Sequence, residues 1–553
     1  MPSWESLRMT DKPQISAAAL VKARADDDNV ALIFGDQTWT WREVVAEAAV
    51  RAEWMRDTLH RARPPHIGVL LPNVPEYVFQ ILGAALAGAC IVGLNATRRG
   101  AELARDIAHT ACQFVIADPT YADLVEEAVL VADAPWAAHA GAQLPDDEPS
   151  PSTLLFLLFT SGSTSAPKAA KCSQSRLAGV AANLGFGAEA VLYCPMPLSH
   201  GNALSATLFP ALASGCSLVL RDKFSASAWL DDVRRNGVTF TSTVGRALGY
   251  ILATPPTPLD RDHRLRVVLA PEASPRDCDA FRERFGARVL SGYGSSEGGI
   301  SLLPAAKPGS LGTAPKGADI AVVDEHGRQC AVAEFDANGV LSNAADAIGE
   351  LVRRDAAGSF EGYWDNPEAQ SDRLRDGWFW SGDLAYRDGD GVFWFAGRVG
   401  DWIRVDSENF AAGPVERIVG RYEHAAAAAV FGVPDPAGGD QVMAVLEMAP
   451  GHVFDPGDFA EFLGAQADLG TKWAPRFVRV TPAIPVVGHG KVDKKPLRRA
   501  AWLSADPLWW RQDRSLVYVP FTAHDRDSWR EQFIAHGRIQ AYPESGAATP
   551  ERL

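Results

Sequence analysis

The sequence predicts an α/β fold with a large multi-layer N-terminal domain and a small α+β C-terminal domain. Short apolar runs alternate with helix-like segments through the first half of the chain, which is the pattern of parallel strands joined by helices. After Gly317 the pattern changes to short strands separated by Gly and Asp turns. A chain of 553 residues is also too long for one compact core.

The first elements are expected to be buried. Apolar runs at residues 66–71 and 90–94 are typical of strands in a parallel-rich sheet. The most apolar stretch, residues 77–92, contains one glutamine and two glycines and falls short of the roughly 18 to 20 apolar residues of a membrane-spanning helix. We therefore expect a buried helix there. Further strands are expected at residues 154–159, 216–220, 237–242 and 266–270.

The later elements form a small β subdomain, which completes the N-terminal domain, and then a final mixed region. Strand-like runs of the β subdomain lie at residues 319–324, 349–353 and 391–395. A boundary near Gly400 divides the chain into residues 1–399 and 400–553. In the final region we expect helices at residues 412–422 and 456–467 and a strand at residues 441–448.

Composition and charge exclude several classes of protein. A net charge of −15 argues against a nucleic-acid partner, so an anionic substrate must meet locally placed cations. The seven cysteines contain no C-x-x-C pair, which argues against disulfides and zinc and favours a reducing, cytoplasmic location. Residues 1–28 lack the apolar core of a signal peptide. Peripheral membrane contact and a homodimer both remain open.

The first chemical signal is a Ser/Thr/Gly-rich loop at residues 160–169, which reads TSGSTSAPKA and follows a strand-like run. Backbone N–H groups, several hydroxyls and the ammonium of Lys168 can together surround a triphosphate. Taken alone, such a loop is a plain surface turn about as often as it is a phosphate-binding loop. The spacing is not that of the common P-loop, because no G-x-x-x-x-G-K-[ST] pattern is present.

The loop resembles the phosphate loop T-S-G-[ST]-T-G-x-P-K-G of the superfamily of acyl-CoA synthetases, peptide-synthetase adenylation domains and luciferases. Ser165 and Ala169 replace two glycines of that pattern, which implies a stiffer loop. The resemblance implies that the loop binds the phosphates of ATP. The residues concerned are Thr160, Ser161, Gly162, Ser163, Thr164 and Lys168.

A second signal, GYGSSE at residues 292–297, resembles the Y-G-x-T-E element of the same superfamily. The resemblance implies that Tyr293 stacks on adenine, that the Ser296 hydroxyl meets phosphate and that Glu297 holds Mg²⁺. A flat ring suits a base, and a hard carboxylate oxygen suits magnesium. Alone, the segment would be a glycine turn with a solvated glutamate. Gly292, Gly294 and Ser295 complete the expected nucleotide-binding segment.

Two short elements follow in the expected order. SGD at residues 381–383 and GR at residues 397–398 resemble the T-G-D and G-R elements of the superfamily. By that resemblance Asp383 accepts hydrogen bonds from both ribose hydroxyls, and Arg398 donates to the nucleotide. A carboxylate has acceptor capacity for two hydroxyl donors at once. Each tripeptide is uninformative alone, and their order after the loop gives them meaning.

The fourth element, GHGKVDKKPL at residues 488–497, resembles the C-terminal G-K element of the superfamily. Its lysine contacts the carboxylate and the α-phosphate during adenylation, which identifies Lys491 as the candidate. An ammonium group relieves the repulsion between two anions brought together. Lys494 and Lys495 are expected to be solvated neighbours, as most lysines are.

Segments from about residue 41 to residue 510 resemble the fatty-acid transport protein and very-long-chain acyl-CoA synthetase branch, including mycobacterial fatty-acid-CoA ligases. Ser407 and Arg246 depart from that branch, which favours Gly and an acidic residue there. His200, in the PLSHGN element, is a candidate for the acyl site, although a lone loop histidine is as often structural. Glu272 falls where the superfamily wraps adenine with main chain, so its side chain need have no role.

The resemblance implies an ATP-dependent acyl-CoA synthetase that uses ATP, Mg²⁺ and coenzyme A. Its substrate would be a small-molecule carboxylic acid, with fatty, steroid side-chain and aryl-alkanoate acids all open. By the same resemblance the C-terminal domain is mobile and swings about Gly400, since glycine adopts many backbone angles at little cost. A stand-alone adenylating enzyme that loads a carrier protein would share every nucleotide motif. A catalytically inactive binding protein is disfavoured, because Lys168, Glu297, Asp383 and Lys491 are all present.

Overall fold

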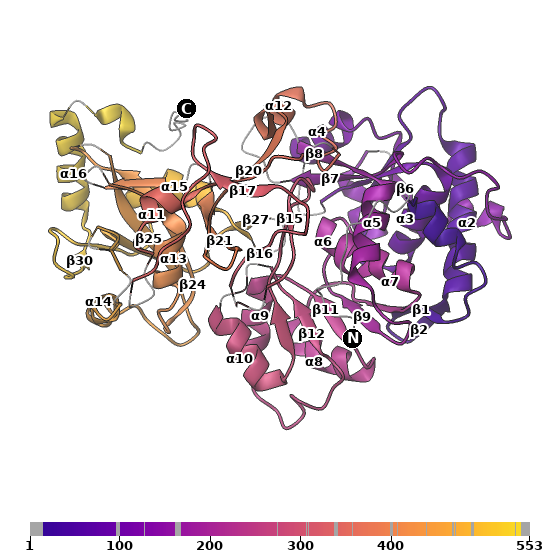
Figure 1. Ribbon diagram of the computed structural model, residues 1–553, viewed down its shortest axis with the longest axis horizontal. Coiled ribbons are helices and arrows are strands. Elements are labelled where there is room, and N and C mark those ends of the chain that lie inside the picture. Colours follow the sequence, from indigo (N-terminus) through magenta and orange to yellow (C-terminus); the bar gives the residue numbers. More distant parts are fainter. Residues whose placement is uncertain are drawn as a thin grey trace. The chain divides into compact units, whose positions relative to one another are not determined.

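The structure of the protein is a computed structural model (Figure 1). The chain packs as two compact units, the first formed by Met1–Asp319 and Arg353–Phe379, and the second by Ile320–Val352 and Trp380–Leu553. The described residues are 15–95, 100–126, 128–160, 168–271, 273, 275–305, 307, 309–336, 341–356, 358–398, 402–405, 408–437, 439–466, 469–470, 472–487, 491–536 and 538–543.

The first unit contains a six-stranded sheet in the order β6-β5-β3-β4-β7-β8. All its neighbouring strands are parallel except β7 and β8, which are antiparallel. Every residue of β3 and β4 is buried, which agrees with their unbroken apolar sequences. The strands are β3 (His66–Leu70), β4 (Cys90–Gly93), β5 (Phe114–Ala117), β6 (Ala128–Leu130), β7 (Leu154–Thr160) and β8 (Lys168–Ser173).

A second, seven-stranded sheet of the same unit has the order β13-β12-β11-β9-β10-β1-β2. Only the β1–β2 pair is antiparallel. Parallel strands need helical crossovers, which the alternating sequence pattern predicts. The strands are β1 (Val30–Phe34), β2 (Gln37–Thr40), β9 (Val191–Cys194), β10 (Ser217–Leu220), β11 (Phe240–Ser242), β12 (Val267–Leu269) and β13 (Arg288–Leu290).

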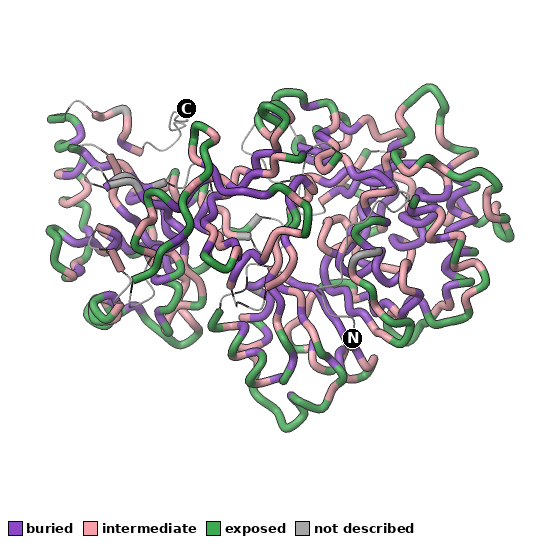
Figure 2. Tube along the Cα trace, viewed as in Figure 1, coloured by how far each residue is buried: buried purple, intermediate pink, exposed green. Residues whose placement is uncertain are grey.

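Helices cover these sheets and share their cores. Buried residues of α2, α3, α5 and α7 join residues of both sheets in one apolar cluster, so the first unit is layered (Figure 2). A second cluster joins α8, α9 and α10 to β9 and β12 (Figure 1). The longer helices are α1 (Ala17–Lys22), α2 (Trp41–Thr58), α3 (Pro75–Ala87), α4 (Gly100–His109), α5 (Gln174–Leu184), α8 (Ala226–Arg235), α9 (Gly245–Leu252), α10 (Pro275–Phe285) and α12 (Pro367–Arg373).

The helix that follows His200 changes its winding. It runs from α6 (Gly201–Ala203) through a π-helical stretch, η5 (Leu204–Leu208), into α7 (Phe209–Ser214). Pro210 lies in the first turn of α7, has no N–H to donate and would clash with a carbonyl one turn earlier in a regular α-helix. The wider stretch accommodates this proline, and π-helical stretches recur at functional sites.

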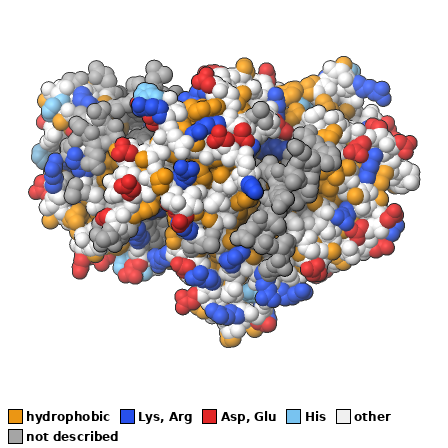
Figure 3. Space-filling model, in the orientation of Figure 1, with side chains coloured by type: hydrophobic (Ala, Val, Ile, Leu, Met, Phe, Trp, Pro, Cys, Tyr) orange, Lys and Arg blue, Asp and Glu red, His pale blue; other side chains and the backbone are white. Residues whose placement is uncertain are grey.

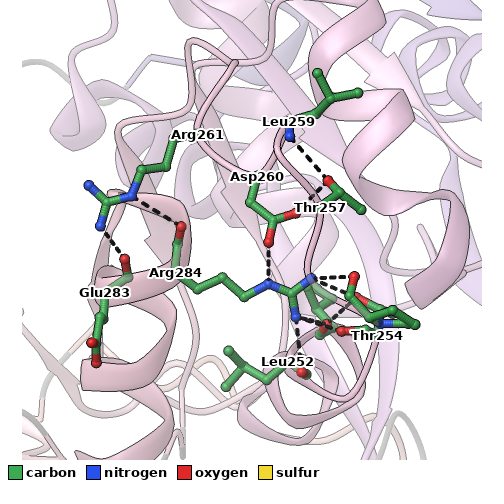
Figure 4. Close-up of polar contacts among 10 residues, drawn as sticks. Leu252, Thr254, Thr257, Leu259, Asp260, Arg261, Glu283 and Arg284 are labelled. Atoms are coloured by element: carbon green, nitrogen blue, oxygen red, sulfur yellow. Dashed lines mark hydrogen bonds and ion pairs between the residues drawn. The ribbon is translucent and has the colours of Figure 1, made fainter.

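Arg284 of α10 fastens the loop that follows α9 (Figure 4). Its Nε donates to Asp260 Oδ2 over 2.6 Å, and its Nη1 donates to the carbonyls of Leu252 and Thr254 over 3.0 and 2.7 Å. Its Nη2 donates to the carbonyl of Pro255 over 3.0 Å. A planar guanidinium with five donors suits such a set of acceptors. The loop is therefore held to α10 although it contains no regular element.

The second unit holds β17, β18, β20 and β21 of one sheet and all strands of a separate mixed sheet. β21 and β20 pair antiparallel, and β18 and β17 follow in that order. The mixed sheet has the order β24-β25-β26-β29-β30. The strands are β17 (Ile320–Val323), β18 (Gly349–Arg353), β20 (Trp378–Arg387), β21 (Val392–Arg398), β24 (Ala425–Pro434), β25 (Asp440–Met448), β26 (Phe477–Thr481), β29 (Leu508–Trp510) and β30 (Val519–Pro520).

Short hairpins and helices complete the second unit. Its apolar residues cluster around α13 and α14, around Trp502 and α16, and around Ile348, Leu384 and Ala396. The remaining elements are α11 (Ala344–Ala347), β22 (Trp402–Val405), β23 (Glu408–Ala411), α13 (Ala412–Val419), α14 (Pro456–Gly464), β27 (Val486–Val487), β28 (Lys491–Val492), α15 (Lys494–Ala500) and α16 (Ala523–Ala535).

One sequence-based expectation needs adjustment. Residues 77–92 do not form a single helix, because α3 ends at Ala87 and Gly88 takes a left-handed conformation with φ of 72°. The chain then enters β4 at Cys90. Among the described residues, no helix combines the length and apolar character needed to cross a bilayer. On the face shown in Figure 3, acidic and basic side chains are interspersed.

Candidate functional site

The Ser/Thr/Gly-rich loop joins two antiparallel strands that bring its ends together. Thr160, the last residue of β7, is the register partner of Lys168, the first residue of β8. The Lys168 side chain is buried and only 9% exposed. Lys168 thus lies at the neck of a Ser/Thr/Gly-rich loop, the type of segment that binds anions. Ser161, Gly162, Ser163 and Thr164 lie outside the described residues.

A remote segment, residues 361–364, lies against β8. Lys171 N donates to the carbonyl of Gly362 over 3.0 Å, and Trp364 N donates to the carbonyl of Ala169 over 2.8 Å. Ala170 and Tyr363 form an antiparallel bridge between these two bonds. The segment therefore continues the sheet beside the strand that carries Lys168.

Glu361 completes this attachment. Its carboxylate accepts from Ser173 N over 2.7 Å and from Ser173 Oγ over 2.5 Å. Ser173 is also the N-cap of α5, where its Oγ accepts from Arg176 N over 3.2 Å. An N-cap hydroxyl satisfies a backbone donor that the helix itself leaves unpaired. Segment 361–364, β8 and the start of α5 are thus joined.

Glu297 lies in the turn between β14 (Tyr293–Gly294) and β15 (Ser301–Leu302), which pair antiparallel. Its Oε1 accepts a hydrogen bond of 3.0 Å from the hydroxyl of Tyr363. Among the described residues, none donates to its Oε2. The half-buried carboxylate is therefore held through Oε1, and carboxylate oxygens are ligands that Mg²⁺ favours.

Arg176 holds the backbone of the same turn. Its Nη2 donates to the carbonyl of Ser296 over 2.6 Å, and its Nη1 donates to the carbonyl of Lys171 over 2.8 Å. Gly298 is required beside it, because φ there is +85° and an added Cβ would lie 2.5 Å from the guanidinium carbon of Arg176. The turn that carries Glu297 is thereby tied to β8 and α5.

Hydroxyl groups and His200 adjoin this turn. Ser295 Oγ is buried and has no hydrogen-bond partner among the described residues, which suits a site completed by a polar ligand. A Cβ at Gly201 would lie 3.7 Å from Ser296 Oγ, so the start of α6 lies beside the turn. His200 precedes α6, and burial lowers its pKa to about 4, which leaves the imidazole neutral near pH 7.

Asp383 and Arg398 belong to the second unit, where they are register partners on β20 and β21. Ser381 Oγ donates to the carbonyl of Leu351 over 2.7 Å and accepts from Asp383 N over 3.1 Å. Gly382 N donates to Glu350 Oε1 over 2.8 Å. These bonds hold the SGD segment, and with it the Asp383 backbone, against β18. The Arg398 side chain lies outside the description.

Lys491 begins β28 and pairs in register with Val487 of β27. The intervening turn, residues 488–490, and the Lys491 side chain lie outside the described structure. The expectation that Lys494 is a solvated neighbour is wrong. Its Nζ lies 2.7 Å from Glu416 Oε2, and its side chain is 17% exposed.

The remaining site predictions cannot be compared with the structure. Glu272 and Gly400 lie outside the described residues. Conversely, three residues that contact the site were not predicted from the sequence. No local motif marks these residues, because each contacts a segment that is remote in the sequence. They are Tyr363, Arg176 and Glu361.

The chemistry of the first unit fits the phosphates of ATP and a magnesium ion. Lys168 supplies a cation, Ser295 and Ser296 supply hydroxyls, and Glu297 supplies a hard oxygen donor. The orphaned Ser295 hydroxyl is the clearest structural sign of a missing polar partner. Gly292, Tyr293 and Gly294 lead directly into this group.

Comparison with known proteins finds one matching family model and several similar CoA ligases and synthetases. A family model described as AMP-binding enzyme matches residues 21–364. Steroid-22-oyl-CoA synthetase of Rhodococcus jostii (strain RHA1) is 46% identical over 544 residues, which cover 94% of this chain and 98% of that protein. Medium/long-chain-fatty-acid–CoA ligase FadD17 of Mycobacterium tuberculosis (strain ATCC 25618 / H37Rv) is 41% identical over 510 residues, covering 90% and 98%.

Solved structures support the fold. The anthranilate CoA ligase AuaEII in complex with anthranoyl-AMP superposes with a TM-score of 0.80 at 21% identity, covering 89% of this chain and 98% of that one. Its architecture confirms the α/β class and the combination of a large N-terminal and a small C-terminal domain.

Proposed function

The chain belongs to the AMP-binding enzyme family, and we propose that it is an ATP-dependent acyl-CoA synthetase for a fatty or steroid side-chain acid. In the first half-reaction a carboxylate oxygen of the acid attacks the α-phosphorus of ATP, and pyrophosphate leaves. In the second, the sulfur of the CoA thiol attacks the acyl carbonyl, its proton passes to solvent, and AMP leaves. ATP, Mg²⁺ and coenzyme A are the cosubstrates and cofactor.

The phosphates are assigned to the first unit. Lys168 and the loop after Thr160 surround them, and the Ser295 and Ser296 hydroxyls donate to phosphate oxygens. Glu297 holds the metal ion through oxygen. Mg²⁺, when bound, offsets the negative charge of the phosphates.

Three residues are assigned to the nucleoside. Tyr293 stacks on the adenine ring and Asp383 accepts from the ribose hydroxyls. Arg398 donates to the nucleotide. The register pairing of Asp383 with Arg398 supports a shared role, because it places the two residues opposite each other on adjacent strands.

Lys491 and His200 are assigned to the reacting acid, and Gly400 to the change between half-reactions. Lys491 offsets the repulsion between carboxylate and α-phosphate in adenylation, and Gly400 is the pivot between half-reactions. His200 lines the acyl site. Its neutral imidazole, at the start of α6, suits an acid with a large hydrocarbon body, since it carries no charge to be desolvated.

One observation favours a steroid side-chain acid as the substrate. It is the 46% identity to steroid-22-oyl-CoA synthetase over nearly the whole of both chains. The 41% identity to FadD17 favours a medium- or long-chain fatty acid as the second candidate. An enzyme that loads a carrier protein is not favoured, because these relatives are CoA ligases by name.

We further infer a cytoplasmic location. We also propose a homodimer as the assembly to be tested. All seven cysteines are unpaired thiols in the structure, which supports a reducing compartment. Size-exclusion chromatography with light scattering measures the assembly directly.

A panel of acids tests the substrate. Pyrophosphate release is measured with C8 to C18 fatty acids, steroid side-chain acids and aryl-alkanoates, and the thioester is identified by mass spectrometry with free CoA. Selective turnover of steroid or long-chain acids supports the proposal. Turnover confined to aryl acids, or transfer only to a carrier protein, would contradict it.

A further inference from the structure

Tyr363 contacts the proposed metal-binding carboxylate from a rigid position. Its side chain is 2% exposed and packs with Phe360, Ala170 and Ala369. The Phe360 and Tyr363 rings meet edge to face, with centroids 5.4 Å apart and an interplanar angle of 73°. A ring held on several sides leaves its hydroxyl little freedom, so the place of the hydroxyl is set by the core.

The Tyr363 hydroxyl is a donor near neutral pH. A phenol keeps its proton at neutral pH, since its ordinary pKa is about 10. It therefore donates to Glu297 Oε1, at the 3.0 Å already described, rather than competing with the carboxylate for a proton.

The same residue is part of the sheet that carries Lys168. Tyr363 bridges Ala170, two residues beyond Lys168, and the hydrogen bonds of Gly362 and Trp364 flank this bridge. A displacement of the β8 edge would consequently move Lys168 and the Tyr363 hydroxyl together. The carboxylate of Glu297 is thus oriented from the strand that also presents the phosphate-binding ammonium.

We propose that Tyr363 is a positioning residue that holds Glu297 with Oε2 presented to the magnesium ion of Mg²⁺-ATP. The role rests on the proposed function, in which Glu297 binds that ion. A glutamate on a turn has three rotatable bonds, and ordering it on binding costs affinity. The Tyr363 hydrogen bond orders the carboxylate beforehand. Outer partners of metal ligands typically affect metal affinity by about 10-fold to 100-fold.

The test compares two tyrosine hydroxyls. Tyr363→Phe removes the contact with Glu297 while keeping the ring. Tyr193→Phe is a matched control, because the buried Tyr193 hydroxyl donates to Asp232 over 2.9 Å in the same unit. ATP binding is measured by calorimetry with excess Mg²⁺ and again in EDTA, and thermal unfolding is recorded for each protein.

We expect Tyr363→Phe to weaken Mg²⁺-ATP binding about 10-fold, with metal-free ATP binding unchanged. Tyr193→Phe should leave both affinities as in the wild type. In a Glu297→Gln background, Tyr363→Phe should cause no further loss, because the hydroxyl acts through that carboxylate.

Three results would overturn the role. They are unchanged Mg²⁺-ATP affinity in Tyr363→Phe, an equal loss with and without metal, and an additive loss in the Glu297→Gln background. Wild-type protein that binds no Mg²⁺-ATP would instead overturn the proposed function, and the positioning role with it.

Discussion

Replacing Gly298 by alanine should destabilise the turn that carries Glu297. At φ of +85° an alanine is strained by about 1 to 2 kcal/mol. Its Cβ would also lie 2.5 Å from the Arg176 guanidinium carbon, so Arg176 must move and lose its 2.6 Å bond to the Ser296 carbonyl. A hydrogen bond from a charged donor contributes about 1.5 kcal/mol or more. The expected loss of folding stability is therefore about 3 kcal/mol.

Urea denaturation measures this loss, and Gly179→Ala provides the control. Gly179 lies in α5, the helix of Arg176, and an added Cβ there meets no atom within 4 Å. Alanine in a helix is favoured over glycine by up to about 1 kcal/mol, so this variant should gain stability. The two changes are chemically identical and should act in opposite directions.

A double-mutant cycle separates strain from contact. In an Arg176→Met background the cost of Gly298→Ala should fall by about 1.5 kcal/mol, because the hydrogen bond is already absent. A Gly298→Ala protein of wild-type stability, or an unchanged cost in the Arg176→Met background, would refute the reasoning from Arg176.

The remaining predictions concern the chemistry. Lys491→Ala should lose adenylation, and synthetic acyl-adenylate with CoA should restore turnover; equal slowness with that bypass would count against the assignment. Asp383→Ala should weaken ATP binding by about 2 kcal/mol, roughly 30-fold by calorimetry, and unchanged affinity would sink the ribose contact. His200 has a pKa lowered by burial from 6.5 to about 4, so its neutral form contributes stability that is fully present above pH 6.5 and lost as pH falls toward 4. Urea denaturation should show about 2 kcal/mol of this loss by pH 5, and a His200→Gln protein with the same pH dependence would contradict it.

The strands were predictable where burial dictates sequence. Residues 66–71 and 349–353 were predicted as strands, and β3 and β18 occupy these positions, with every residue of β3 buried. The end of α3 was missed, because the apolar run continues past Ala87 and only the left-handed Gly88 marks the break.

The site was predictable where one segment carries the chemistry. Residues 292–297 form one continuous segment, β14 and the start of the turn after it, so their local pattern was enough to mark Glu297. Tyr363 was not predictable, since its role arises only when residues 361–364 pair with β8. Lys494 was misjudged for a related reason, because its partner Glu416 lies on α13, far away in the sequence.

Product analysis tests the central claim most directly. The protein is incubated with ATP, Mg²⁺, CoA and a steroid side-chain or long-chain fatty acid, and pyrophosphate, AMP and acyl-CoA are quantified together. The account predicts that the three appear in equal amounts, and that pyrophosphate with acyl-AMP forms when CoA is left out. Release of ADP and phosphate in place of AMP and pyrophosphate, or no thioester from any acid, would contradict it.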